Sequence, residues 1–336
     1  MGLPVVAVVG ATGAVGVEFL DCLVKRKFPL KELRLLASAR SAGKTMTFAG
    51  KTITVQELTE KSFAGVDIAL FSAGGSISKK FGPLAAAAGA VVVDNSSAFR
   101  MDPNVPLVIP EINPEAIRQH KGIIANPNCS TIIAIVPLWP IHKVNRIVRL
   151  QSATYQAASG AGAAAMQELL DSTKAYLEGK PFTPRIIPHP YAFNLFSHTS
   201  KIDPVTGYNE EETKMLFETR KIFGDPNIRV SATCVRVPVL RAHTEALTIE
   251  CERSITPAEV FRLLEKAPGV KIVHDVEKNY FPMPKDASGQ GDVLVGRIRQ
   301  DVSDPTGKSI CMLVAGDQLL KGAALNAVQI AELLAR

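Results

Sequence analysis

The sequence predicts an α/β protein in two parts, a doubly wound parallel sheet followed by an α+β domain with a mixed or antiparallel sheet. In the first part, short apolar, often Val-rich runs alternate with helical patterns, as expected of strands buried on both faces of a parallel sheet. After Pro140 the pattern changes, and strand patterns such as 293–300 and 309–315 follow one another without a helix between them. The 336 residues are enough for two sizeable cores.

The composition is that of an ordinary globular protein, with 46% hydrophobic and 21% charged residues. No apolar run reaches the length of a membrane span, and residues 1–16 lack the basic stretch that begins a signal peptide, so we expect a cytoplasmic protein without a membrane partner. Five cysteines, odd in number and without a CxxC pair, predict neither a disulfide framework nor a zinc site.

The net charge of +6 is not gathered in a dense cluster, and no nucleic-acid-binding motif accompanies it. The excess is compatible with small anionic substrates, and equally with a mildly basic surface of no specific meaning.

A strand, a glycine-rich turn and a helix open the chain. The strand Pro4–Val9 leads directly into Gly10-Ala-Thr-Gly-Ala-Val-Gly16 and then into a helical pattern. Glycines let the backbone approach a pyrophosphate, which binds at the N-terminus of such a helix. This context predicts a Rossmann-type dinucleotide site, although the spacing is GxxGxxG rather than GxGxxG. A tight turn without a ligand is the alternative.

The end of the second strand, Glu32–Ala37, indicates which nucleotide binds. In NAD-binding proteins an acidic residue typically ends this strand and holds the ribose hydroxyls. Here no acidic residue stands there, and the side chains that follow suit a 2′-phosphate instead, namely Ser38, Arg40, Ser41 and Lys44. We therefore predict NADP rather than NAD, with a solvated basic turn as the alternative.

Two further strands, at 66–71 and 90–93, end in small or polar residues. Ligands of open parallel sheets bind beyond such carboxyl ends. Arg100 follows the later strand by a few residues, where it would reach a phosphate or a carboxylate, or else make a surface ion pair.

Cys129 stands between Asn128 and Ser130, just before the apolar run Ile132–Val136. This pattern predicts a tight turn that feeds a buried helix, capped by Asn128 or Ser130. A thiol at a helix N-terminus faces unpaired N–H groups and the positive end of the helix dipole, and both favour the reactive thiolate. The alternative is that Cys129 is one more small buried side chain.

In the C-terminal part, a strand at 149–156 leads through a glycine-rich turn to a helix at 164–177. The excursion at 180–208 is rich in Pro, aromatic residues and His, and loops of that length tend to be functional or to form interfaces. The helix that follows carries Asn209 and Glu212 at the spacing of a capping box.

Four polar residues of this part remain ambiguous. Glu211 and Lys214 share one face of their helix, which also fits a solvated ion pair. Arg236 and His243 lie in or between two strands, and the proline turn between them leaves open whether they share a face. For His243 alone, a structural histidine is the simpler interpretation. The last segment, 316–336, reads as an amphipathic helix that needs a surface to bury against.

Together these stretches resemble aspartate-β-semialdehyde dehydrogenase in its bacterial form, over nearly the whole chain. No single motif is decisive, but eight in this order are highly specific. They are GATGAVG at 10–16, ASARSAGK at 37–44, DNSSAFR at 94–100, NPNCST at 126–131, SATYQAASGAG at 152–162, EETK at 211–214, RVPVLRAH at 236–243 and DQLLKGAALNAVQIAE at 317–332.

The resemblance implies an enzyme that reduces L-aspartyl 4-phosphate with NADPH to L-aspartate 4-semialdehyde and phosphate, in the biosynthesis of lysine and diaminopimelate, threonine, methionine and isoleucine. It implies a homodimer, with 180–208 a candidate for the interface. It also implies an NADP-binding domain at 1–128, a catalytic and dimerisation domain at 129–315, and a C-terminal helix at 316–336 that returns to the nucleotide domain.

The resemblance also implies roles by position. Cys129 is the expected nucleophile and His243 the general acid/base, while Gln156 helps to orient the acyl group. The substrate α-carboxylate is expected at Arg236 and its amino group near Glu211. The other expected ligands are Arg100 and Lys214 for the phosphate, and Gly10, Thr12, Gly13, Ala14, Val15, Arg40, Ser41, Ser159, Gly160 and Gln318 for NADP; no metal is expected.

Three alternatives stay open. N-acetyl-γ-glutamyl-phosphate reductase performs the same chemistry on a longer acyl phosphate, but its cysteine motif has Gly before the Cys and Tyr after it, where this chain has Asn128 and Ser130. Glyceraldehyde-3-phosphate dehydrogenase fits less well, since neither its cysteine motif nor an NAD-type acidic residue is present. A catalytically silent NADP-binding relative should lack the nucleophile or the base, whereas Cys129, Gln156 and His243 are all present.

Overall fold

The computed structural model describes residues 2–335, which divide into two compact units. The first unit combines the chain up to Asn128 with the chain from Ala323 onward, and the second runs from Cys129 to Gly322. Within the described residues, no helix has the length and apolar character needed to cross a membrane.

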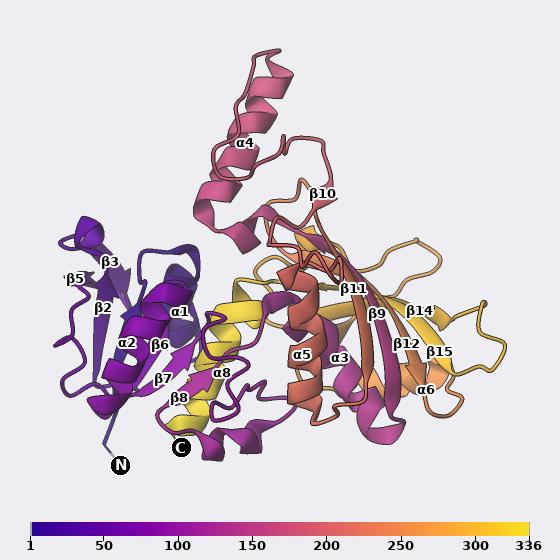
Figure 1. The fold of residues 1–336 in the computed structure, drawn as a ribbon, viewed down its shortest axis with the longest axis horizontal. Coiled ribbons are helices and arrows are strands. Elements are labelled where there is room, and N and C mark those ends of the chain that lie inside the picture. The colour runs from indigo at the N-terminus through magenta and orange to yellow at the C-terminus, as the bar shows by residue number, and fades with distance from the viewer. Residues whose placement is uncertain (1, 336) are drawn as a thin grey trace. The chain divides into compact units, whose positions relative to one another are not determined.

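The first unit is built on a six-stranded sheet in the order β5-β2-β1-β6-β7-β8, with every strand parallel to its neighbours (Figure 1). This confirms the parallel sheet that the alternating pattern predicts. Its strands are β1 (Val5–Val9), β2 (Glu32–Ala37), β5 (Gln56–Glu57), β6 (Ile68–Phe71), β7 (Val91–Asp94) and β8 (Ile123–Ala125). A separate hairpin and the helices complete the unit: β3 (Thr45–Phe48), β4 (Lys51–Thr54), α1 (Ala14–Lys25), α2 (Gly75–Ala87), α8 (Leu325–Leu334) and the 3₁₀ turns η1 (Ala39–Ser41) and η2 (Pro114–Gln119).

The turn between β1 and α1 depends on two of its glycines. Gly10 has a φ of +83°, and a Cβ added there would lie 2.3 Å from the carbonyl oxygen of Ser72. A Cβ at Gly16, inside α1, would lie 2.3 Å from the carbonyl oxygen of Gly10. A side chain at Gly16 would therefore force α1 away from the turn, and a side chain at Gly10 would force the turn away from the chain that follows β6.

The second unit is built on a seven-stranded mixed sheet in the order β10-β11-β9-β12-β15-β14-β13. The pairs β9–β11 and β13–β14 are parallel and the others antiparallel, which confirms the expected mixed sheet. The strands are β9 (Ile147–Gln156), β10 (Phe196–Ser197), β11 (Arg229–Arg236), β12 (His243–Cys251), β13 (Val270–Ile272), β14 (Val293–Gln300) and β15 (Ser309–Gly316). The helical segments are α3 (Cys129–Val144), α4 (Ala163–Leu177), α5 (Glu210–Phe223), α6 (Pro257–Leu264), α7 (Pro284–Ala287), the 3₁₀ turn η3 (Ala158–Ala161) and the π-helical turn η4 (Leu320–Ala324), whose last residues belong to the first unit.

Helix α3 forms the core of the second unit. Its residues from Ser130 to Leu138 are all buried, because it packs on β9, β12, β14 and β15 and lies beside α5 (Figure 1). A helix that is apolar all round has to be enclosed in this way. Helix α5 begins after the capping box that the sequence predicts. The Asn209 side chain accepts from the Glu212 N–H at 3.0 Å, and the Glu212 carboxylate accepts from the Asn209 N–H at 2.9 Å.

The prediction of one helix over 316–336 is wrong in its first part. Strand β15 continues to Gly316, and helical structure begins only at Leu320 with η4, which leads directly into α8 at Leu325. Between them the buried Asp317 carboxylate accepts from the Leu319 N–H at 3.0 Å and from Arg241 at 2.7 Å, which fixes a turn. Residues 316–322 consequently belong to the second unit, while α8 packs on β6 and β7 of the first.

Gly16→Ala should lower the stability of the protein by about 1–3 kcal/mol, since the new Cβ would overlap two backbone carbonyl groups that cannot move aside. Thermal unfolding would measure the loss. Gly75→Ala is the matched control, because a Cβ there meets nothing within 4 Å and alanine favours a helix. Equal melting temperatures for the two variants would contradict this description of the turn.

Candidate active site

Cys129 is the first residue of α3 and follows β8 by three residues. Helix α3 starts at Cys129, so Ser130 lies inside the helix and only Asn128 occupies the capping position. The Cys129 side chain is partly exposed, whereas burial raises the pKa of the Cys22 and Cys251 thiols to about 12. A partly exposed thiol at the start of a helix is the arrangement that favours a reactive thiolate.

His243, the first residue of β12, lies next to this thiol. Its Nε2 is 3.6 Å from Cys129 Sγ, and its Nδ1 accepts a hydrogen bond of 3.0 Å from the backbone N–H of Ala157. A backbone N–H can only donate, so Nδ1 carries no hydrogen and the neutral ring holds its hydrogen on Nε2. Burial, and then the neighbouring Arg236 cation, lower the pKa of His243 to about 3. At neutral pH the ring is therefore uncharged and directs Nε2–H toward the sulfur.

The backbone before His243 is strained and is held by Gln318. Ala242 has a φ of +71°, a conformation that costs a residue with a side chain about 1–3 kcal/mol. Gln318 Oε1 accepts from the Ala242 N–H at 2.9 Å, and Gln318 Nε2 donates to the Ser159 hydroxyl. Ser159 and Gln318, two residues expected at the nucleotide, therefore lie in contact with each other. Gln318 also fixes the backbone at Ala242, next to His243.

Two glycines leave room around the Cys129 and His243 side chains. A Cβ at Gly160 would lie 3.0 Å from both His243 Cε1 and Arg236 Nη1, and a Cβ at Gly322 would lie 2.8 Å from Cys129 Cβ. The sequence prediction included Gly160 and missed Gly322. The only sequence signal for Gly322 was its place in the motif that contains Gln318.

Gln156, at the end of β9, connects α3 to α5 by hydrogen bonds. Its Nε2 donates to the Ser130 hydroxyl at 2.6 Å and to Glu211 Oε1 at 3.1 Å. Glu211 is buried and pairs through Oε2 with Lys214 Nζ at 3.0 Å, so this pair is not the solvated one that helix spacing alone would allow. The amide orientation of Gln156 is thus fixed by two acceptors beside Cys129.

Arg236 ends β11 and is buried. Its Nη1 donates to the Ala157 carbonyl at 2.9 Å, and its Nη2 donates to His198 Nε2 at 2.9 Å. The structure therefore brings Arg236 into the same group as His243, which the sequence left undecided. His198 is a neighbour that the sequence prediction missed, although it lies in the excursion 180–208, which was expected to be functional or to form an interface.

Arg100 belongs to the first unit and is held at the carboxyl ends of two strands. Its Nη2 donates to the Asn95 carbonyl at 2.7 Å and its Nε to the Asn126 carbonyl at 2.9 Å. Asn126 is itself fixed, since its side-chain oxygen accepts from Asn326 at 2.6 Å. Arg100 is buried, so the alternative of a surface ion pair is wrong.

The residues of the first unit that are expected to hold the nucleotide fit a dinucleotide phosphate. Helix α1 starts with Ala14 and Val15, and Gly13 before it supplies no capping side chain, so the first N–H groups stay available to an anion. The Thr12 hydroxyl is 3.4 Å from that of Ser41 in η1, which joins the glycine turn to the segment after β2. Strand β2 ends in Ala37, and Arg40 is exposed in that segment, as a 2′-phosphate would require.

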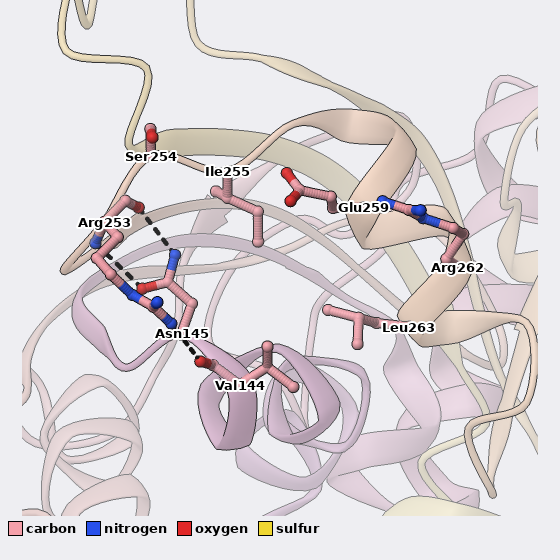
Figure 2. A pocket seen from close by; sticks show the side chains of 8 residues that line it. All are labelled: Val144, Asn145, Arg253, Ser254, Ile255, Glu259, Arg262 and Leu263. Atoms are coloured by element: carbon pink, nitrogen blue, oxygen red, sulfur yellow. Dashed lines mark hydrogen bonds between the residues drawn. The ribbon is translucent and has the colours of Figure 1, made fainter.

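Figure 2 shows a separate hollow of the second unit, at the opposite end of β12 from His243. Arg253 and Asn145 in this hollow hydrogen-bond to each other through side chain and backbone, and Arg253 also donates to the Val144 carbonyl at 2.7 Å. None of the eight residues that line it is a candidate site residue. This hollow is therefore not part of the site around Cys129.

Two family models match the chain. Residues 5–120 match the semialdehyde dehydrogenase NAD binding domain, and residues 138–321 match the semialdehyde dehydrogenase dimerisation domain.

Curated relatives match over almost their whole length. The aspartate-semialdehyde dehydrogenase of Synechocystis sp. is 58% identical over 332 residues, covering 98% of this chain and 96% of the relative. That of Aquifex aeolicus is 53% identical over 336 residues, covering 98% of each. Among solved structures, aspartate semialdehyde dehydrogenase II from Vibrio cholerae, complexed with ASA, has a TM-score of 0.96 at 47% identity and covers 99% of this chain and 98% of its own.

His243→Phe should slow the alkylation of Cys129 by iodoacetamide at pH 7 about tenfold or more. The variant keeps the ring volume but removes the Nε2–H donor, and a hydrogen bond to a charged group contributes about 1.5–3 kcal/mol. Peptide mass spectrometry would follow the rate, with the partly exposed Cys311 as the internal control. An unchanged rate at Cys129 would show that the imidazole does not stabilise the thiolate.

Proposed function

The chain belongs to the aspartate-semialdehyde dehydrogenase family, and we propose that it reduces L-aspartyl 4-phosphate with NADPH to L-aspartate 4-semialdehyde and phosphate through a thioester on Cys129. The names of the relatives favour this substrate over the longer N-acetyl-γ-glutamyl phosphate. This is an oxidoreductase reaction of amino-acid biosynthesis, on the route to lysine through diaminopimelate and to threonine, methionine and isoleucine.

The observation that carries the proposal is the approach of Cys129 Sγ to His243 Nε2, 3.6 Å apart at the start of α3. The thiolate attacks the acyl phosphate carbon, a C–S bond forms, and the C–O bond to phosphate breaks. A covalent intermediate of this kind splits one difficult displacement into two easier steps. The silent-relative alternative lacks support, because nucleophile and imidazole are both present and adjacent.

Reduction follows at the thioester. Bound NADPH supplies the hydride; the thioester carbonyl carbon receives it, and the oxygen becomes the oxyanion of a thiohemiacetal. The neutral His243 ring, with its hydrogen on Nε2, donates a hydrogen bond to that oxyanion and then to the sulfur as the C–S bond breaks. Its lowered pKa keeps the ring in this donor form at neutral pH.

Charged residues match both ends of the substrate. Arg236 would bind the α-carboxylate through its fork of N–H groups, and Glu211 would accept from the amino group. Arg100 and Lys214 would neutralise the phosphate, and Gln156 would orient the acyl group. The buried contacts described above support these roles, because each side chain is already held in one orientation.

The cofactor is NADP. The proposed ligands in the first unit are Gly10, Thr12, Gly13, Ala14, Val15, Arg40 and Ser41, and those in the second are Ser159, Gly160 and Gln318. The open N-terminus of α1 suits the pyrophosphate, and Arg40 with Ser41 suits the 2′-phosphate.

We also propose that the protein is a homodimer acting in the cytoplasm, with no nucleic-acid or membrane partner. The match to a dimerisation domain supports the dimer. So does a set of exposed large apolar side chains, three in α4 and three in the excursion 180–208 expected at the interface: Leu170, Tyr176, Leu177, Phe193, Leu195 and Val205.

Cys129→Ala should abolish the phosphate-dependent oxidation of L-aspartate 4-semialdehyde, since the variant lacks the thiol that forms the proposed thioester. Binding of NADPH, followed by fluorescence titration, should stay within about twofold, because the thiol is not a proposed nucleotide ligand. Cys311→Ala is the matched control and should keep full activity. Near-normal turnover in Cys129→Ala would refute the covalent mechanism.

A further inference from the structure

His198 has no role in the mechanism above, yet its ring contacts Arg236, the residue proposed to bind the substrate α-carboxylate. It follows strand β10, which pairs antiparallel with the end of β11 so that Phe196 lies opposite Arg236. The His198 N–H continues this pairing by donating to the Cys234 carbonyl at 2.8 Å. The register of the two strands therefore delivers the ring to Arg236, with Nε2 2.9 Å from Nη2.

The direction of this hydrogen bond follows from the chemistry of the two groups. A guanidinium has five N–H donors and no acceptor, so Nε2 of His198 accepts from Arg236 Nη2. On the other side of the ring, Nδ1 is 3.0 Å from the Ser200 hydroxyl oxygen and 3.2 Å from the Ser200 backbone nitrogen. The Ser200 hydroxyl oxygen accepts from the Glu211 N–H at 3.2 Å. Ser200 thus holds the His198 ring on the side opposite Arg236 and is itself tied to the backbone of Glu211.

These contacts fix the guanidinium in one plane. Nη1 donates one hydrogen to the Ala157 carbonyl and Nη2 donates one to His198. Each of these nitrogens keeps a second hydrogen that it can donate to a ligand, and a guanidinium commonly binds a carboxylate through two of its N–H groups. Without an acceptor at His198, the guanidinium would lose one of these two hydrogen bonds and keep only the one to Ala157.

We propose that His198 is a positioning residue for Arg236 and thereby sets the affinity for the α-carboxylate of the substrate. This inference rests on the proposed function. Burial lowers the pKa of His198 to about 4, so the ring remains a neutral acceptor at neutral pH. A protonated ring would present two donors and a second positive charge to Arg236, which would break the contact.

The test is a steady-state comparison of His198→Ala, His198→Gln and the control Thr199→Ala in the phosphate-dependent oxidation of L-aspartate 4-semialdehyde with NADP. Thr199 is the exposed neighbour. His198→Ala should raise the KM for the semialdehyde about tenfold or more, with kcat changed less than about threefold. The KM values for phosphate and NADP should not change. Glutamine offers an amide oxygen to Arg236 and should restore most of the affinity.

Each other outcome overturns the inference. An unchanged KM for the semialdehyde in His198→Ala would show that the ring does not position Arg236. A parallel rise in the KM for phosphate, a fall in melting temperature equal in the alanine and glutamine variants, or no rescue by glutamine would indicate a merely structural role. Wild-type protein that does not oxidise the semialdehyde would overturn the proposed function and this inference together, so the two failures are distinguishable.

Discussion

The hydrogen bond from the Ala157 N–H to His243 Nδ1 is the interaction on which the rest of the site depends. It determines which ring nitrogen carries the hydrogen, and so makes Nε2–H a donor toward Cys129. The same peptide segment serves the substrate-binding side, because the Ala157 carbonyl accepts from Arg236. One residue at the end of β9 therefore orients both the imidazole and the guanidinium. Main-chain atoms at a strand end are well suited to this task, since the sheet holds them rigidly.

Several features of the site lower the stability of the fold but hold the reactive groups in position. Ala242 stays in a left-handed conformation because Gln318 holds its N–H, and His243 is buried without charge at the cost of its solvation. Gly160 and Gly322 leave the space into which side chains would otherwise project. These features give a donor, a thiol and a guanidinium fixed positions before any ligand binds, which reduces the reorganisation needed during reaction.

The sequence predicted the features that depend on neighbouring residues, and missed those that depend on contacts between distant residues. The parallel sheet, the helix that begins at Cys129 and the Asn209 capping box follow from patterns within about ten residues, and all appear in the structure. The pairing of Cys129 with His243 spans 114 residues, and no spacing rule reaches that far. The resemblance to a family suggested it, whereas periodicity alone favoured a structural histidine. Residues 316–319 were predicted as the start of the last helix, but they end β15 and form a turn fixed by hydrogen bonds to Asp317, and helical structure begins only at Leu320. His198 was missed because only the register of β10 against β11 gives it a partner.

The covalent role of Cys129 is the central claim, and the acyl-enzyme itself tests it most directly. The protein would be mixed with L-aspartyl 4-phosphate in the absence of reduced cofactor, and its peptides mapped by mass spectrometry. The account predicts release of phosphate together with one aspartyl adduct on the peptide that contains Cys129, and loss of that adduct when NADPH is added. An adduct on another residue, or reduction without any acylated cysteine, would contradict it.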